Sequence, residues 1–190
     1  GIVDLYKEIA PDANFDPANV PMNTSPPLVS KDIIVVPTSM QTGGAPKSMK
    51  HTKADIMAFD VRTGKKAWVF HTIPRAGEYG ADTWLNRSNE YTGHTGAWPP
   101  FSVDEELGYL YLPVEDATGD VYGGHRPGNN LFSSSLVCLD IKTGKRIWHQ
   151  QLVHHDIWDY DPPSSPLLVD INASGRRIQA GVRLGQTAIA

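Results

Sequence analysis

Residues that can perform acid–base, metal-binding or stacking chemistry gather in a few stretches of this chain. Carboxylates suit a hard divalent cation or a general base, and an indole ring suits stacking against a flat ligand. The candidates are His51, Trp84, His94, Trp98, Glu115, Asp116, Asp120, His125, His154, His155, Asp156, Trp158, Asp159 and Asp161. Because these residues are far apart in the sequence, the elements that carry them decide whether they form a site.

A repeated segment identifies those elements. The stretch from Ala58 to Trp68 recurs from Cys138 to Trp148, 80 positions later, with the shared pattern A/C-x-D-x-x-T-G-K-x-x-W. Its Asp can accept hydrogen bonds from the N–H groups of a tight turn, and its Gly can supply the positive φ that precedes a second strand. The Trp then anchors that strand in the core. We predict that one strand of each unit ends near Asp60 and Asp140, and that the next strand starts near Lys65 and Lys145.

Two further strand-like runs precede each copy of the repeat, so each unit has four strands. Four-stranded units repeated along a chain are typical of a β-propeller, whereas a sandwich or a simple barrel would not need the same turn at the same place in each unit. We therefore predict an all-β partial β-propeller that forms a single domain over residues 1–190. The expected blades cover residues of about 25–72 and 99–152, and the next blade starts at about 164.

The connections between these strands differ greatly in length. In an up-and-down blade the first and third turns lie on one face, and the other connections lie on the opposite face. The short turns lie on the first face, and the long connections, at residues of about 40–53, 73–98, 116–133 and 152–163, lie on the second. Long loops in a compact domain are usually functional, so we expect a site on that second face, where the candidate residues fall.

Composition excludes several classes of function. The chain has 190 residues, 40% of them hydrophobic, and a formal net charge of -4, so it offers no basic surface for nucleic acid or an anionic membrane. Its one cysteine, Cys138, falls in a strand-like run and is interpreted as a buried small hydrophobe. The first residues show neither an initiating Met nor a signal pattern, so an internal segment of a longer protein is expected.

Three stretches resemble the dehydrogenases that depend on pyrroloquinoline quinone (PQQ), the quinoproteins, and most closely their membrane-type glucose dehydrogenase branch. The stretches are the repeat with its closing Trp, the run from Trp98 to Pro113, and His154-His-Asp-Ile-Trp-Asp-Tyr-Asp161. The resemblance implies an eight-bladed propeller, of which this chain holds two complete blades and parts of the flanking ones. It also implies PQQ on the propeller axis with a Ca²⁺ or Mg²⁺ ion at its quinone.

The same resemblance implies roles for individual residues. Asp156 matches the general base that takes the substrate hydroxyl proton, and Asp159 is the second candidate for that role. His51, Trp98 and Trp158 are expected to contact the cofactor. Trp98 matches the indole that forms the floor of the cofactor-binding chamber. Asp116, and Glu115 beside it, are expected to bind the metal.

Some features leave alternatives open. Asp156 could instead cap its turn by accepting hydrogen bonds, and Trp98 and Trp158 could serve packing. His154 and His155 are adjacent, so both cannot face one site if the backbone is extended. The Lys or Arg that relatives place against the quinone is replaced by Gln186, and Arg183 is the nearest cation.

Two functions from different classes remain. The favoured one is the oxidation of a sugar or alcohol, glucose above all, with ubiquinone or a cytochrome c as electron acceptor. Such an enzyme would be periplasmic, with any membrane anchor outside this chain. The alternative is a non-catalytic propeller scaffold of the outer-membrane assembly type. The acid-rich loops favour the dehydrogenase, since a scaffold has no need of them.

Overall fold

The computed structural model describes residues 2–12, 15, 26–38, 49–98, 100–182 and 185–186. Residues 40–48 of the first long connection and Arg183 lie outside the described part, so the predictions made for them are untested. The helices, including the 3-10 helices η1 and η2, are α1 (Leu5–Ile9), η1 (Ala81–Thr83) and η2 (Leu85–Glu90). The strands are β1 (Leu28–Ser30), β2 (Ile33–Val36), β3 (Ile56–Asp60), β4 (Lys66–Phe70), β5 (Ser102–Asp104), β6 (Tyr109–Val114), β7 (Ser135–Asp140), β8 (Arg146–Gln151), β9 (Leu167–Ala173) and β10 (Arg176–Val182).

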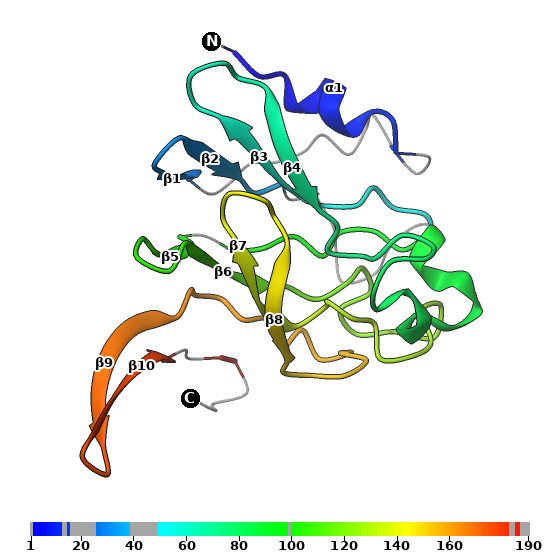
Figure 1. Cartoon of the computed structure of the whole chain (residues 1–190). Helices are drawn as coiled ribbons and strands as arrows, with labels where there is room; N and C mark the ends of the chain where they lie inside the picture. Colours follow the sequence, from blue (N-terminus) through cyan, green and yellow to red (C-terminus); the bar gives the residue numbers. More distant parts are fainter. Residues whose placement is uncertain are drawn as a thin grey trace.

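The described strands form two four-stranded antiparallel sheets, with strand orders β1-β2-β3-β4 and β5-β6-β7-β8, and a separate β9–β10 hairpin. Both sheets follow the up-and-down order that the repeat predicts, so the prediction of four-stranded blades is confirmed. Figure 1 shows the tight turns of the two sheets toward the left of the view and the long connections toward the right.

The repeated turn has the same geometry in both sheets. Oδ1 of Asp60 accepts hydrogen bonds from the Thr63 N–H at 2.7 Å and the Thr63 hydroxyl at 2.8 Å. Oδ1 of Asp140 accepts the same two bonds from Thr143 at 2.8 and 2.7 Å. Both sheets also carry a register shift at the equivalent step of the third strand, between residues 58 and 59 and between residues 138 and 139. The predicted strand ends near Asp60 and Asp140 are confirmed, and β4 and β8 begin at Lys66 and Arg146, one residue after the predicted Lys65 and Lys145.

The tryptophan of the first repeat joins the two sheets. Nε1 of Trp68 donates to the backbone oxygen of Ile141 at 2.9 Å, and the ring is 8% exposed. A Cβ added at Gly144 would lie 2.6 Å from Cδ2 of Trp68, so only glycine allows this approach of the ring. Trp148, the equivalent tryptophan of the second sheet, is 38% exposed and faces the β9–β10 side.

The core between the sheets follows the strand period of two. Ile56 and Ala58 of β3 join Leu110 of β6 and Val137 of β7 in one buried cluster. The alternate residues of β3, Met57 and Phe59, face the other way and pack with Ile9 of α1. Both faces of the first sheet are thus covered, as expected for a stacked blade. The structure also contains no helix long and apolar enough to cross a membrane within the described residues.

Candidate functional site

The long connections run side by side and are tied together by isolated bridges. His94, in the connection after β4, pairs with Lys53 before β3 and with Ala117 after β6, and Ala97 pairs with Val114. These bridges gather three connections on one face. The candidate residues are therefore held by loops that brace one another.

Asp116 follows β6 and is buried, with 3% of its surface exposed. Its Oδ1 accepts hydrogen bonds from the Ala117 N–H at 2.6 Å and the Ser133 hydroxyl at 2.8 Å. Its Oδ2 accepts one from Nη2 of Arg126 at 3.2 Å. Burial raises the pKa of Asp116 to about 8; Arg126 opposes this shift, and the neighbouring charge of Asp156 adds to it.

Asp156 follows β8 and is 1% exposed. Its Oδ2 accepts from the Ser134 hydroxyl at 2.8 Å and the Tyr160 N–H at 3.1 Å, and its Oδ1 accepts from the Trp158 N–H at 3.0 Å. The two backbone bonds are the turn-capping contacts that the sequence left open as an alternative. These contacts fix the direction of the carboxylate, and Oδ1 accepts a single hydrogen bond.

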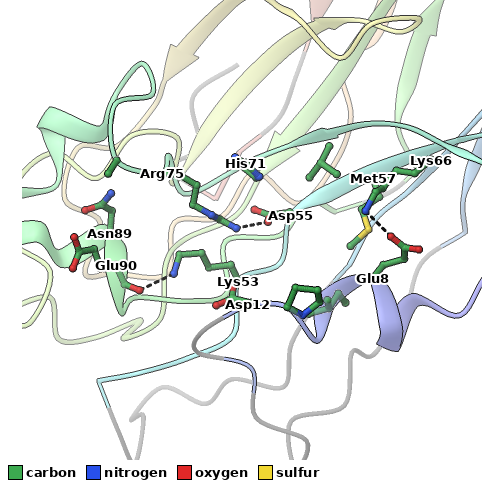
Figure 2. A pocket seen from close by; sticks show the side chains of 14 residues that line it. Glu8, Asp12, Lys53, Asp55, Met57, Lys66, His71, Arg75, Asn89 and Glu90 are labelled. Carbon is green, nitrogen blue, oxygen red and sulfur yellow. Dashed lines mark hydrogen bonds and ion pairs between the residues drawn. The ribbon is translucent and has the colours of Figure 1, made fainter.

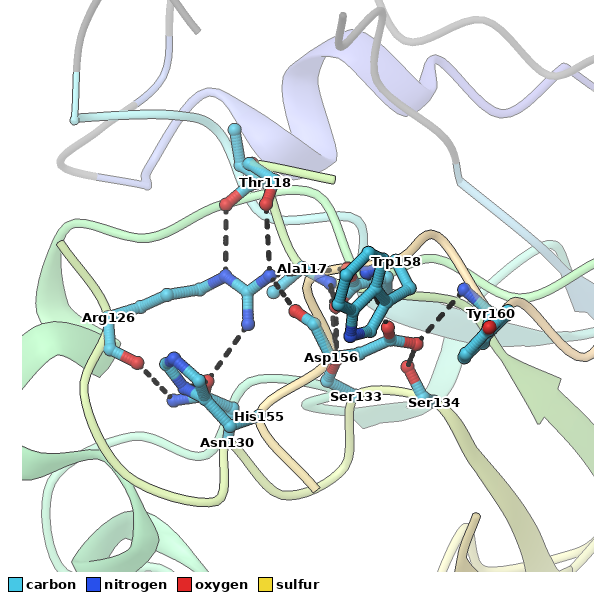
Figure 3. A network of polar contacts seen from close by, with 12 residues as sticks. Ala117, Thr118, Arg126, Asn130, Ser133, Ser134, His155, Asp156, Trp158 and Tyr160 are labelled. Atoms are coloured by element: carbon cyan, nitrogen blue, oxygen red, sulfur yellow. Dashed lines mark hydrogen bonds and ion pairs between the residues drawn. The ribbon is translucent and has the colours of Figure 1, made fainter. Parts of the chain in front are cut away.

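Arg126 contacts the Asp116 carboxylate and the Asp156 backbone, and sequence reasoning missed it. Figure 3 shows its guanidinium between Thr118 and Asn130. The side chain is fully buried. Its Nη2 donates to Oδ2 of Asp116 at 3.2 Å and to the backbone oxygen of Asp156 at 2.5 Å, while its Nη1 donates to Oδ1 of Asn130 at 2.9 Å. The sequence signal for it was weak, because a single Arg in a glycine-rich loop is usually exposed. A buried guanidinium needs acceptors for its five N–H donors, and here the site loops supply them.

Glu115 points away from Asp116 toward two other partners. Its Oε1 lies 3.2 Å from Nε2 of His94, and its Oε2 accepts a hydrogen bond from the indole N–H of Trp98. Burial alone would raise the pKa of Glu115, but His94 and Trp98 outweigh that effect and hold the pKa below its ordinary value. In turn Glu115 holds the pKa of His94 above its ordinary value despite burial. Glu115 therefore orients the Trp98 ring, and its role as a metal ligand stays a prediction.

The remaining predicted residues lie around this network. Trp98 and Trp158 are 43% and 67% exposed, so both rings are accessible for stacking. Asp159 is exposed beside Asp161, whose Oδ1 accepts the Asp116 N–H at 2.7 Å. His51 lies in the adjoining connection, where its N–H donates to the backbone oxygen of Tyr91 at 3.0 Å.

Of the adjacent histidines, one is part of the network. His154 is exposed, whereas Nδ1 of His155 lies 2.9 Å from the Gly128 oxygen and 3.1 Å from Oδ1 of Asn130. His125 also has a structural contact, because its Nε2 lies 3.1 Å from the Thr118 oxygen. The structure thus brings Asp116, Asp156 and Trp158 into one network through Arg126.

The oxygen donors of this network suit a cation. Four carboxyl groups are buried, those of Glu115, Asp116, Asp156 and Asp161. Arg126 forms an ion pair with Asp116, and His94 lies beside Glu115. Within the described residues no group of three His, Cys, Asp or Glu is arranged to hold a metal ion. Oδ2 of Asp116 and Oδ1 of Asp156 each accept one protein hydrogen bond, so each keeps a free lone pair. The donor set therefore fits part of a site for a hard divalent cation, to which other ligands must contribute.

A separate cavity of about 640 Å³ lies between the first sheet and α1 (Figure 2). Nη2 of Arg75 lies 2.5 Å from Oδ2 of Asp55, and Nζ of Lys53 donates to the Glu90 oxygen at 3.1 Å. Burial lowers the pKa of Lys53 to about 8. None of the predicted site residues lines this cavity, so it is separate from the candidate site.

Stacked four-stranded antiparallel sheets joined by long connections are the arrangement expected of β-propeller blades. The chain belongs to the PQQ family described as the glucose/ethanol/alcohol dehydrogenase β-propeller domain, which it matches over residues 1–189. The membership that the sequence indicated is therefore confirmed.

Individual relatives agree with this assignment. The chain is 36% identical over 159 residues to a quinoprotein glucose dehydrogenase of Escherichia coli (strain K12), which covers 82% of the chain and 19% of that protein. It is 35% identical over 150 residues to a quinoprotein glucose dehydrogenase of Gluconobacter oxydans, covering 78% and 18%. The chain spans about a fifth of the length of these relatives.

A solved structure shows the same fold. The quinohemoprotein alcohol dehydrogenase of Pseudomonas putida HK5 superposes with a TM-score of 0.75 at 26% identity, covering 90% of this chain and 26% of that one. The quinohemoprotein alcohol dehydrogenase of Comamonas testosteroni gives a TM-score of 0.72 at 24% identity, covering 86% and 25%. These matches confirm the predicted propeller architecture.

Proposed function

We propose that this chain forms part of the active site of a PQQ- and metal-dependent dehydrogenase that oxidises a sugar or an alcohol, with glucose favoured. The observation that carries the proposal is that Arg126 joins two segments with buried aspartates on the face of the long connections, because it donates to the Asp116 carboxylate and to the Asp156 backbone oxygen. Family membership favours this function over a non-catalytic scaffold.

The chemistry is divided between the cofactor and this chain. When bound, PQQ supplies the hydride acceptor, and a divalent cation polarises its quinone carbonyl. Asp116 would provide a carboxylate oxygen for that cation. Trp98, oriented by Glu115, and Trp158 would present indole faces to the flat ring system.

Asp156 would accept the proton of the substrate hydroxyl. Ser134, Trp158 and Tyr160 donate to its carboxylate, so its oxygens are held in one orientation before substrate arrives. A fixed base within reach of the hydroxyl is what general base catalysis requires. Asp159, which is exposed, is the second candidate.

The wider biochemical setting follows from the resemblance to membrane-type glucose dehydrogenases. Electrons would pass from the reduced cofactor to ubiquinone or a cytochrome c. The enzyme would work in the periplasm, and any inner-membrane anchor would lie outside this chain.

Asp156→Asn in the PQQ-loaded holoenzyme tests the assignment, with Asp159→Asn as the matched control. Asn keeps the shape of the side chain and removes the proton acceptor, so turnover should fall at least about 10²-fold. Asp159→Asn should have a much smaller effect. If Asp156→Asn retains most of its turnover while Asp159→Asn loses it, the roles are reversed; if both remain active, neither residue is the base.

A further inference from the structure

Two adjacent serines before β7 contact the two aspartates separately. The Ser133 hydroxyl donates to Oδ1 of Asp116 at 2.8 Å and accepts the Ala117 N–H at 3.2 Å. The Ser134 hydroxyl donates to Oδ2 of Asp156 at 2.8 Å. Ser133 is 1% exposed and Ser134 is fully buried, so water does not compete for these bonds.

The backbone at this point is held firmly. Ser134 has a φ of 47°, in the left-handed region that non-glycine residues seldom adopt. Its N–H donates to the Glu115 oxygen at 3.2 Å, and its oxygen accepts from the Leu152 N–H at 2.9 Å. These bonds tie the serine pair to the segment before Asp116 and to the segment before Asp156. A positive φ that persists among satisfied hydrogen bonds indicates a conformation fixed by its surroundings.

We propose that Ser133 and Ser134 are positioning residues with separate tasks, Ser133 orienting Asp116 for the metal and Ser134 orienting Asp156 for proton transfer. The inference rests on the proposed function. It assigns the alignment of both carboxylates to one dipeptide, so the distance between metal ligand and base is set by a rigid local unit. Hydrogen bonds from side chains that touch neither the metal nor the substrate commonly orient metal-binding and catalytic carboxylates.

Ser135 supplies a matched control. It is fully buried, as Ser134 is, but its hydroxyl donates to the Ser133 oxygen at 3.0 Å and not to either carboxylate. Alanine at each of the three positions removes one buried hydroxyl, which makes two hydrogen bonds at Ser133 and one each at Ser134 and Ser135. Effects that arise only from the loss of a buried hydrogen bond should therefore be similar in all three variants.

The experiment compares the three alanine variants in the PQQ-loaded holoenzyme. Calorimetric titration with Ca²⁺ should show a Kd about tenfold higher for Ser133→Ala, the scale expected for losing a hydrogen bond to a charged group, and less than about twofold higher for the other two. At saturating Ca²⁺, Ser134→Ala should lower kcat about tenfold with little change in KM, and Ser135→Ala should leave kcat within about twofold. Thermal unfolding verifies that each variant is folded.

Equal changes in the Kd for Ca²⁺ and in kcat in all three variants would overturn the inference. It would also be overturned if Ser133→Ala lowered kcat and Ser134→Ala raised the Kd for Ca²⁺. If the unsubstituted holoenzyme neither binds Ca²⁺ nor oxidises sugars or alcohols, the proposed function itself fails, together with the inference. Should an alanine variant not fold, the metal-bound structure of the unsubstituted holoenzyme decides. Hydroxyls that remain in hydrogen-bond distance of Asp116 and Asp156 support the inference, and hydroxyls turned away from them overturn it.

Discussion

Replacing Trp68 with Phe tests how the two sheets are held together. The indole N–H of Trp68 donates to the Ile141 oxygen at 2.9 Å in a buried contact. Phe cannot make this bond, and leaving a buried carbonyl without a partner costs roughly 1–3 kcal/mol. The smaller ring also leaves space beside Gly144, which adds about 1–2 kcal/mol. We therefore expect Trp68→Phe to lower the free energy of unfolding of the 190-residue chain by about 2–5 kcal/mol.

Trp148→Phe is the matched control, because Trp148 occupies the same place in the second repeat but is 38% exposed. We expect it to cost about 1 kcal/mol or less, as is usual for partly exposed positions. Urea unfolding followed by far-ultraviolet circular dichroism measures both values by linear extrapolation. Equal losses for the two variants would refute the argument that the Trp68 contact joins the sheets.

Three further outcomes follow from the same geometry. Gly64 and Gly144 have φ values of 71° and 69°, but only at Gly144 would a Cβ meet the Trp68 ring, so Gly144→Ala should lower the urea midpoint clearly more than Gly64→Ala. Hydrogen bonds from Thr63 hold the pKa of Asp60 below its ordinary value, so the ionised carboxylate stabilises the fold above about pH 4, and this contribution is lost as the pH falls through the lowered pKa. In Asp60→Asn the urea midpoint should therefore decrease less between about pH 5 and pH 3 than in the unsubstituted chain. An equal decrease in the variant and in the unsubstituted chain would contradict this. The 190-residue chain with added PQQ and Ca²⁺ should show no dye-linked dehydrogenase activity, because two sheets and a hairpin cannot enclose the cofactor; robust turnover would exclude that reasoning.

Much of the fold could be predicted from the sequence because its signal is local. The turn at Asp60 needs only an acceptor, a threonine and a glycine in order, and the same set at Asp140 forms the same turn. Because the two copies are 80 positions apart, the strands around each copy are expected to occupy the same places in two successive four-stranded sheets. The blade boundaries proposed from the sequence stay predictions.

The site was less accessible to sequence reasoning because its contacts are non-local. Arg126 falls in the long connection predicted at about 116–133, and nothing near it in the sequence indicates that its partners are Asp116 and the backbone of Asp156. Ser133 falls at the end of the long connection predicted at about 116–133, and nothing in the sequence indicates that it and Ser134 contact the two aspartates. Glu115 was grouped with Asp116 because the two are adjacent, yet the extended backbone directs the Glu115 side chain to Trp98 and His94.

A crystal structure of the holoenzyme with PQQ and Ca²⁺ tests the central claim most directly. The account predicts a cation bound by an Asp116 carboxylate oxygen, at about 2.3–2.6 Å, with the Asp156 carboxylate facing the substrate side of the cofactor and Arg126 still bridging the two loops. A cation bound away from Asp116, with the cofactor on a different face of the sheets, would contradict it.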